Sequence, residues 1–249
     1  MTKRNCLVTG ASKGMGAVIA ARLSAAGHHV ALTARSADQL RSTAADLPGP
    51  TLAIPADVTA SPDPVFAQVE NEWGPVDVLV LNAGAAVAKP LTQLTDDEWQ
   101  GQLDLNLTAP FRYMRRAIPA MVSQGWGRIV VIASIAAKRG EPNVSAYTAS
   151  KHGVLGLVRS AASELARTGV TVNAVCPGYV DTPMTDTNVT LLAERSGRSE
   201  ADIRRALERK HPIDRLITAD EVADAVDLCV LSAAITGQGI VVDGGAVQS

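Results

Sequence analysis

The sequence has little of what marks disulfide-stabilised, metal-binding or membrane-spanning proteins. Its three cysteines, Cys6, Cys176 and Cys229, are widely spaced, and each lies in an apolar segment where a small buried hydrophobe is expected. We therefore expect neither a disulfide nor a metal site, and the four histidines show no metal-binding spacing. No apolar stretch reaches the roughly 18 residues that a membrane span requires, and the N-terminus runs from Lys3-Arg4 directly into a strand-like segment. These absences predict a cytoplasmic protein with no membrane partner.

The charge of the chain also gives no indication of a charged partner. The 249 residues carry a net charge of -2 with no long run of either sign, which argues against a nucleic-acid surface or a polybasic membrane contact. With 47% hydrophobic and 19% charged residues, the chain can bury one large core. We expect residues 1–249 to form a single domain.

Apolar segments rich in β-branched residues alternate with alanine-rich segments of helical spacing. The expected strands are residues 5–9, 28–33, 51–55, 76–81, 128–133, 170–175 and 239–242, and the clearest helices are residues 17–26, 64–73, 109–123, 146–167 and 220–231. Because parallel strands need crossover connections, this alternation predicts an α/β fold: a doubly wound, Rossmann-type, seven-stranded parallel sheet with helices on both faces. Ligands of such sheets bind at the carboxyl ends of the strands, so the loops there should carry the chemistry.

The loop after the first strand is rich in glycine. Gly10, Gly14 and Gly16 would allow backbone amides to approach a phosphate, and the helix that follows offers its positive end. The spacing G-x-x-x-G-x-G departs from the commoner G-x-G-x-x-G, and glycines after a strand also make simple tight turns. The position of this loop, between the first strand and the first helix, favours a dinucleotide site.

The end of the second strand should decide which dinucleotide binds. A carboxylate there accepts hydrogen bonds from the ribose 2′-hydroxyl of NAD, whereas an arginine accommodates the 2′-phosphate of NADP. The chain has Arg35 and Ser36 at this point, and Lys13 in the glycine loop adds a second cation. Both cations could be solvated surface charges. Their occurrence in these two loops, without an acid, predicts NADP(H).

Tyr147 and Lys151 are four residues apart, so in a helix they project from the same face. A cation beside a phenol favours the phenolate and lowers the pKa of the tyrosine from about 10, which suits a general acid or base. Ser134 stands thirteen residues before the tyrosine, after the fifth strand. Without this context, a tyrosine four residues before a lysine is common on helix surfaces.

The ordered set of motifs resembles the short-chain dehydrogenase/reductase family over essentially the whole chain. The motifs are Thr9-Gly10-x-x-x-Gly14-x-Gly16, Asn82-Ala83-Gly84, Asn106, Ser134, Tyr147-x-x-x-Lys151 and Pro177-Gly178. The resemblance implies that Tyr147 donates a proton to the substrate and that Ser134 orients the carbonyl. It also implies that Lys151 binds the nicotinamide ribose and that Asn106 holds a water of a proton relay.

The same resemblance implies a wider set of contacts. Those to the cofactor would come from Gly10, Ser12, Lys13, Gly14, Met15, Gly16, Arg35, Asp57, Val58, Asn82, Ala83, Gly84, Tyr147, Lys151, Pro177, Gly178, Val180 and Thr182. Those to the substrate would come from Ser134, Ala136, Val144, Tyr147, Tyr179 and Met184. Asp57 and Asn106 could instead act as a loop cap and a buried, helix-kinking amide.

A polar, arginine-rich stretch between residues 179 and 216 interrupts the pattern of strands and helices. Ser199, three residues before Asp202, is a plausible N-cap for a helix within it. The resemblance makes residues 184–213 a mobile substrate-binding lid. Its apolar residues could line a cleft while its cations face a phosphorylated handle. Alternatively, the apolar residues could pack the lid helix down, with the arginines solvated beside Glu194, Glu200, Asp202 and Glu208. The residues in question are Leu191, Leu192, Ile203, Leu207 and Ile213, with Arg195, Arg198, Arg204, Arg205, Arg209 and Lys210. We assign no chemistry to His211 in this stretch.

The segments around Tyr147 and Pro177-Gly178 look similar to 3-oxoacyl thioester reductases and aromatic polyketide ketoreductases. This implies a small-molecule ketone or alcohol, with a β-keto group reduced as a coenzyme A or carrier-protein thioester. Carrier-dependent relatives tend to have basic residues before the fifth strand, whereas this chain has Gln124-Gly125-Trp126, so a small cyclic ketone stays open. The alternatives are oxidation of a secondary alcohol or hydroxyacyl-CoA, and a non-catalytic dinucleotide-binding role. Relatives usually form tetramers, so we expect a homotetramer.

Overall fold

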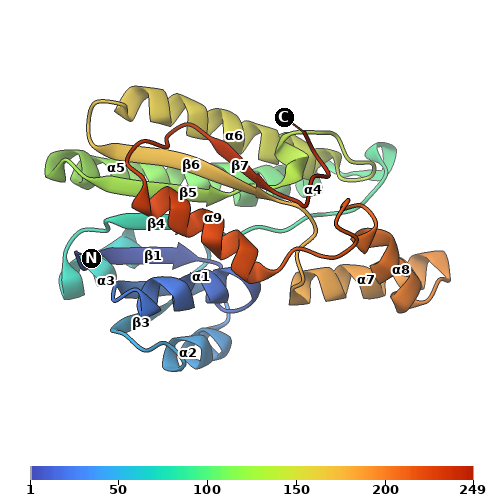
Figure 1. The fold of residues 1–249 in the computed structure, drawn as a ribbon, viewed down its shortest axis with the longest axis horizontal. Helices are drawn as coiled ribbons and strands as arrows, with labels where there is room; N and C mark the ends of the chain where they lie inside the picture. Colours follow the sequence, from blue (N-terminus) through green and yellow to red (C-terminus); the bar gives the residue numbers. More distant parts are fainter. Residues whose placement is uncertain (1, 249) are drawn as a thin grey trace.

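A computed structural model describes residues 2–248 and contains one seven-stranded parallel sheet (Figure 1). The strands are β1 (Asn5–Thr9), β2 (His29–Ala34), β3 (Thr51–Pro55), β4 (Val78–Leu81), β5 (Gly127–Ile132), β6 (Val170–Pro177) and β7 (Gly239–Val242). They lie in the order β3-β2-β1-β4-β5-β6-β7, which confirms the predicted doubly wound sheet. The order reverses between β1 and β4, and this is where ligands of such sheets bind.

Helices connect the strands. They are α1 (Gly14–Ala25), α2 (Ala37–Ala45), α3 (Asp63–Trp73), α4 (Asp96–Leu103), α5 (Ala109–Gln124), α6 (Ser145–Leu165), α7 (Pro183–Ser196), α8 (Glu200–Glu208) and α9 (Ala219–Leu231). The five helices predicted by residue range are confirmed to within three residues at each end. The helix expected in the arginine-rich stretch is α8, where the Ser199 hydroxyl accepts a hydrogen bond from the Asp202 amide (3.1 Å). The sequence did not predict α2, α4 or α7. The start of α4 could have been recognised, because Thr95 and Glu98 form a capping box there.

Both faces of the sheet are covered by hydrophobic clusters. On one face α3, α5 and α6 pack against the strands, with Phe66 and Val154 among the buried side chains. On the other face α1, α2 and α9 do the same, with Ile19 and Val226. All four residues of β4 are buried, which is why this strand reads as an uninterrupted apolar run.

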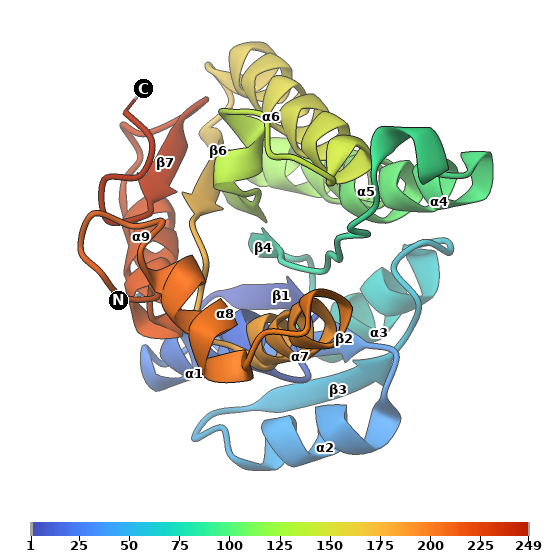
Figure 2. The ribbon, with the colours of Figure 1, turned by 90° about the vertical axis from the view of Figure 1, so that its right-hand side faces the viewer.

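The lid helices α7 and α8 stand at the carboxyl ends of the strands, across from α4 and α6 (Figure 2). The predicted substrate lid therefore faces the edge where the chemistry is expected. The cysteines are buried, as predicted, and are free thiols. Within residues 2–248, no helix is long and apolar enough to cross a membrane.

Candidate active site

Hydrogen bonds join the turns after β1 and β4 at the carboxyl edge of the sheet. The Thr9 hydroxyl accepts from the amides of Asn82 (3.0 Å) and Ala83 (3.1 Å). The side-chain amide of Asn82 donates to the carbonyls of Thr9 (3.1 Å) and Gly10 (3.0 Å). Asn82 therefore fixes the start of the glycine loop. The part played by Thr9 was not predicted, because nothing distinguishes this hydroxyl from that of any threonine ending a strand.

The glycine loop needs glycine for two different reasons. Gly10 and Gly14 have φ angles of 64° and 59°, which side chains rarely adopt. Gly16 has no room for a side chain, since a Cβ there would lie 2.4 Å from the Gly10 carbonyl oxygen and 2.5 Å from the Asn82 side-chain nitrogen. The N-cap of α1 is Lys13, whose side chain makes no capping hydrogen bond, so the first amides of the helix are open to an anion. This loop, with Ser12 and Met15 in it, fits the predicted phosphate-binding element.

Two cations lie at this edge. Lys13 and Arg35 are exposed, and neither side chain makes a hydrogen bond or ion pair with the residues that the structure describes. Asp57 caps its own loop by accepting hydrogen bonds from the Thr59 amide (2.9 Å) and hydroxyl (2.8 Å). These bonds, helped by the charge of Arg35, lower the pKa of Asp57. The loop-cap interpretation of Asp57 is therefore correct, while Val58 beside it is buried.

The structure brings Ser134 and Tyr147 together. Ser134 follows β5, and its hydroxyl accepts a hydrogen bond from the Ala136 amide (3.1 Å). Tyr147 lies in the first turn of α6. Burial raises the pKa of the Tyr147 phenol, and the nearby Ser134 side chain partly opposes that rise. A phenol with a raised pKa keeps its proton at neutral pH and can donate it.

Lys151 lies one helical turn after Tyr147 and is only 4% exposed. Its Nζ donates to the Ile132 carbonyl (2.9 Å) and lies 5.5 Å from the centroid of the Tyr147 ring. Burial lowers the pKa of Lys151 to about 8. The sequence predicts a lowered pKa for Tyr147, but in the structure this pKa is raised, with desolvation as its largest cause. The Lys151 ammonium is directed at a carbonyl oxygen and not at the phenol.

Asn106 lies in a π-helical turn (Asp104–Thr108) between α4 and α5 and is almost fully buried. Its side chain donates to the Ala85 carbonyl (3.0 Å) and accepts from the Ala85 amide (3.3 Å), so it acts as the buried helix-kinking amide considered above. A Cβ on Gly84 would lie 2.9 Å from the Asn106 side-chain oxygen and 3.5 Å from the Lys151 Nζ. Asn106 and Lys151 therefore both lie close to Gly84, which fits a proton path from one to the other.

After β6, the chain passes beside the glycine loop and enters the lid. Pro177 ends the strand, and the Gly178 amide donates to the Val242 carbonyl (3.0 Å). Thr182 immediately precedes α7, and a Cβ on Gly14 would lie 3.6 Å from its side chain. Val180 is buried nearby, where its carbonyl accepts a hydrogen bond from the Thr182 hydroxyl (3.4 Å).

The lid is held down mainly by its own packing. Ile203 and Leu207 of α8 are buried with Val189 and Leu216. Three of the six lid cations form ion pairs: Arg204 with Asp181 and Asp186, Arg205 with Asp202, and Lys210 with Glu141. Leu191, Leu192 and Ile213 stay exposed. The structure therefore supports the packing alternative for Ile203 and Leu207 only, and the three exposed apolar side chains remain candidates for a cleft lining.

The remaining predicted substrate residues lie on three segments. Ala136 is buried behind Ser134, Val144 immediately precedes α6, and Met184 lies in the first turn of α7 with its side chain 48% exposed. Tyr179 follows β6, and its phenol is near enough to contribute to the raised pKa of Tyr147.

The fold and this site belong to a recognisable class. The sequence profile of the short chain dehydrogenase family matches residues 4–191, and the chain belongs to that family. Over 255 residues it is 36% identical to D-beta-hydroxybutyrate dehydrogenase of Rhizobium meliloti (strain 1021), with 98% of each chain covered. It is 39% identical to a putative ketoacyl reductase of Streptomyces coelicolor, with 96% of this chain and 95% of the relative covered. A solved structure of an actinorhodin polyketide ketoreductase with NADPH superposes with a TM-score of 0.93 at 37% identity, with 98% of this chain and 97% of that chain covered.

Proposed function

We propose that the protein is an NADPH-dependent reductase that converts the β-keto group of a 3-oxoacyl thioester or polyketide-like substrate to a secondary alcohol. The observation that carries this proposal is the position of the buried Lys151, whose Nζ lies 5.5 Å from the centroid of the Tyr147 ring and donates to the carbonyl of Ile132 at the end of β5, at the same sheet edge as Ser134 and the glycine loop. The similarity to a putative ketoacyl reductase and to a polyketide ketoreductase extends over nearly the whole chain, lid included, and supports a ketone substrate.

The residues at this edge fit a dinucleotide that carries a 2′-phosphate. The open first turn of α1, with Gly10 and Gly14 before it, would hold the pyrophosphate, and Lys13 and Arg35 would hold the 2′-phosphate. Lys151 would bind the nicotinamide ribose. When bound, the reduced nicotinamide supplies a hydride to the carbonyl carbon of the substrate.

Tyr147 and Ser134 supply the acid chemistry. Negative charge develops on the carbonyl oxygen as its carbon is reduced, so the Tyr147 phenol gives its proton to that oxygen and the Ser134 hydroxyl donates a hydrogen bond to it. Each turnover therefore removes one proton from Tyr147. Lys151 and Asn106, adjacent across Gly84, provide the route by which it is replaced.

A second candidate function is oxidation of a secondary alcohol, such as a hydroxy acid or a hydroxyacyl thioester. The 36% identity to a D-beta-hydroxybutyrate dehydrogenase favours it. The same residues serve both directions, with Tyr147 accepting the hydroxyl proton instead of donating one, because a catalyst lowers both barriers equally.

The test follows oxidation of NADPH and NADH with acetoacetyl-CoA, longer 3-oxoacyl thioesters, cyclic diketones and simple aryl ketones. We expect turnover of a β-keto substrate with NADPH. Turnover confined to alcohols with oxidised cofactor would favour the second candidate. Cofactor binding without any turnover would contradict both and support a non-catalytic dinucleotide-binding protein.

We also propose that the protein is a homotetramer. Exposed apolar side chains on α4, α5 and α9 support self-association, among them Trp99, Phe111, Leu228 and Leu231. Light scattering of the purified chain measures the assembly directly.

The carrier of the substrate is a separate question. Comparing 3-oxoacyl groups on coenzyme A and on a carrier protein determines which carrier the enzyme prefers.

A further inference from the structure

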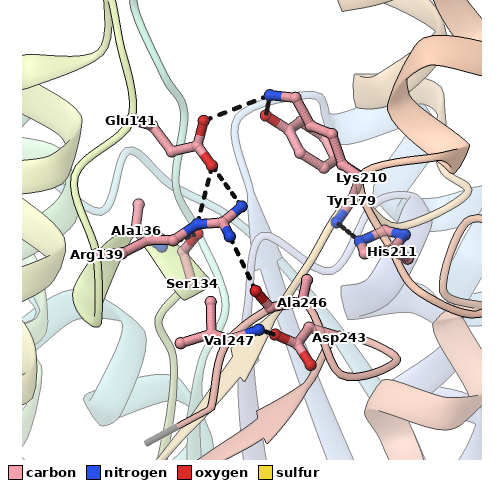
Figure 3. Close-up of polar contacts among 10 residues, drawn as sticks. All are labelled: Ser134, Ala136, Arg139, Glu141, Tyr179, Lys210, His211, Asp243, Ala246 and Val247. Carbon is pink, nitrogen blue, oxygen red and sulfur yellow. Dashed lines mark hydrogen bonds and ion pairs between the residues drawn. The ribbon is translucent and has the colours of Figure 1, made fainter.

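Tyr179 is held at both ends by two consecutive residues at the carboxyl end of the lid (Figure 3). Its backbone amide donates to Nε2 of His211 (3.0 Å), and its hydroxyl accepts from Nζ of Lys210 (2.8 Å). His211 is fully buried, and its Nδ1 faces the Arg215 carbonyl (2.8 Å). Since Nε2 accepts a hydrogen bond, Nδ1 carries the proton and donates it to that carbonyl. The imidazole is therefore a fixed, neutral link between the lid and the end of β6.

No side chain other than hydrogen fits at position 178 while this link exists. A Cβ on Gly178 would lie 2.3 Å from Nε2 of His211 and 3.2 Å from the Asp243 side chain. Position 178 thus requires glycine partly because of His211, a residue to which the sequence assigned no role. The sequence could not indicate this role, because the amide that His211 binds is 32 residues away and backbone groups leave no pattern in a sequence.

Lys210 extends the link to the loop that follows Ser134. Its Nζ lies 3.4 Å from the Glu141 carboxylate, whose side chain is only 13% exposed. Burial lowers the pKa of Lys210, but the Tyr179 hydroxyl and Glu141 raise it by more, so the group stays an ammonium. Arg139 donates twice to the same carboxylate (2.7 and 3.1 Å). Glu141 is thus a largely buried anion that binds two cations, although the Lys210 side chain itself is 42% exposed. Removal of one partner leaves this buried carboxylate with fewer compensating charges.

Arg139 in turn fixes the segment after β7. Its guanidinium donates to the Ala246 carbonyl (3.0 Å). The buried Asp243 carboxylate accepts from the amides of Gly245 (2.9 Å) and Val247 (2.7 Å), which folds this segment back beside the site (Figure 3). Tyr179 at the end of β6 is therefore linked directly to the end of the lid, through Lys210 to the loop after Ser134, and through Glu141 and Arg139 to the segment after β7.

We infer that Lys210, His211 and Glu141 are positioning residues for the ketone, which act by holding Tyr179 in place beside Tyr147 and so set the affinity for the substrate. The inference rests on the proposed reductase function. Tyr179 lies between the end of β6 and the lid, and Ser134 lies at the end of the neighbouring strand β5, which pairs with β6 so that Ile132 is opposite Val175. Displacement of its ring would change the space available to the ketone without changing the phenol that donates the proton or the loops that face the cofactor.

Lys210→Met tests the inference, because it removes the ammonium and keeps an unbranched stem. Arg209→Met is the matched control: Arg209 is exposed, is one residue earlier, and its side chain makes no hydrogen bond or ion pair with the described residues. Loss of a charge-assisted hydrogen bond predicts that Lys210→Met raises KM for the ketone about tenfold, with a smaller change in kcat and an unchanged KM for NADPH. Arg209→Met should leave all three constants at the parent values.

Glu141→Gln should also raise KM for the ketone, because it weakens the contact with Lys210 and the hydrogen bonds from Arg139. The double variant should lose less than the sum of the two single variants, because the contact between Lys210 and Glu141 is lost in both. Lys210→Arg should restore most of the affinity. If Lys210→Met raises KM for the ketone no more than Arg209→Met does, or if the double variant shows additive losses, the inference is wrong.

Hydrogen exchange at the Tyr179 amide gives a readout that does not depend on turnover. The amide should exchange faster in Lys210→Met than in the parent and should keep the parent rate in Arg209→Met. A parent enzyme that reduces no ketone would overturn the proposed function, whereas exchange would still report whether Lys210 holds Tyr179. Equal exchange in all three proteins would contradict the positioning role.

Discussion

The proposed cofactor side and the proposed substrate side of this sheet edge are built in different ways. On the cofactor side, backbone geometry dominates: positive φ angles at Gly10 and Gly14, a contact at Gly16 that excludes any Cβ, and hydrogen bonds between the ends of β1 and β4. On the substrate side, charged side chains from distant segments meet around Tyr179. Backbone contacts tolerate almost no variation, whereas one charge can be exchanged without refolding the chain. The two sides should therefore respond differently to substitution.

Tyr147 lies where the two sides meet, so its replacement should have the largest effect. Tyr147→Phe removes the donated proton, and we expect kcat to fall about a thousandfold while NADPH binding is unchanged. Turnover and fluorescence titration of NADPH measure the two quantities. Tyr113→Phe is the matched control, because the buried Tyr113 hydroxyl has no partner among the described residues. Substantial turnover by Tyr147→Phe would remove the tyrosine from the assigned role.

Arg35→Asp tests the cofactor side through charge alone. If Arg35 faces a 2′-phosphate, its reversal should shift the ratio of kcat/KM for NADPH over NADH towards NADH by about 10- to 100-fold, the size of one or two charge-assisted hydrogen bonds. Arg41→Asp, which makes the same charge change on the neighbouring helix α2, should leave the ratio near the parent value. An unchanged ratio in both variants would contradict the phosphate assignment.

Gly16→Ala tests whether backbone contact is as strict as the distances indicate. The new methyl group would force apart the glycine loop and Asn82, and overpacking of this kind costs about 1–3 kcal/mol in the free energy of unfolding. Gly101→Ala is the control: nothing lies within 4 Å of a Cβ there, so alanine in α4 should stabilise the helix slightly. Denaturant unfolding measures both. A Gly16→Ala protein as stable as its parent would show that the loop can adjust.

The contrast also explains what the sequence could predict. The strands, the glycine loop and the Ser134, Tyr147 and Lys151 set follow from local patterns and ordered motifs, and the structure places these residues at one sheet edge. The hydrogen bonds of Thr9 and His211 could not be predicted in this way, because their partners are backbone groups far away in the sequence. The predicted direction of the Tyr147 pKa shift was wrong for a related reason. The shift depends on the burial of the phenol, which the spacing of Tyr147 and Lys151 does not indicate.

The smallest expected effect is a pH dependence on the cofactor side. The pKa of Lys151 is lowered to about 8 by burial, so raising the pH through this value removes the ammonium that would bind the ribose. We expect kcat/KM for NADPH to be near its maximum below this pH, about half of it when half the lysine is protonated, and lower above it. In Lys151→Arg the fall should move to higher pH, because arginine keeps its charge. A flat profile through this range in the parent enzyme would contradict the assignment.

The position of Asn106 depends on the number of residues in the π-helical turn at Asp104–Thr108 as well as on their identity. A π-helical turn takes up one residue more than an α-helical turn, so deleting one residue would leave a regular helix running from α4 into α5. Each α-helical residue turns the chain by about 100°, and such a deletion would rotate Asn106 away from Ala85 by about that angle. A chain shortened by one residue at this point would lose the buried hydrogen bonds between Asn106 and Ala85, so we expect it to be less stable and to lose the proposed proton relay.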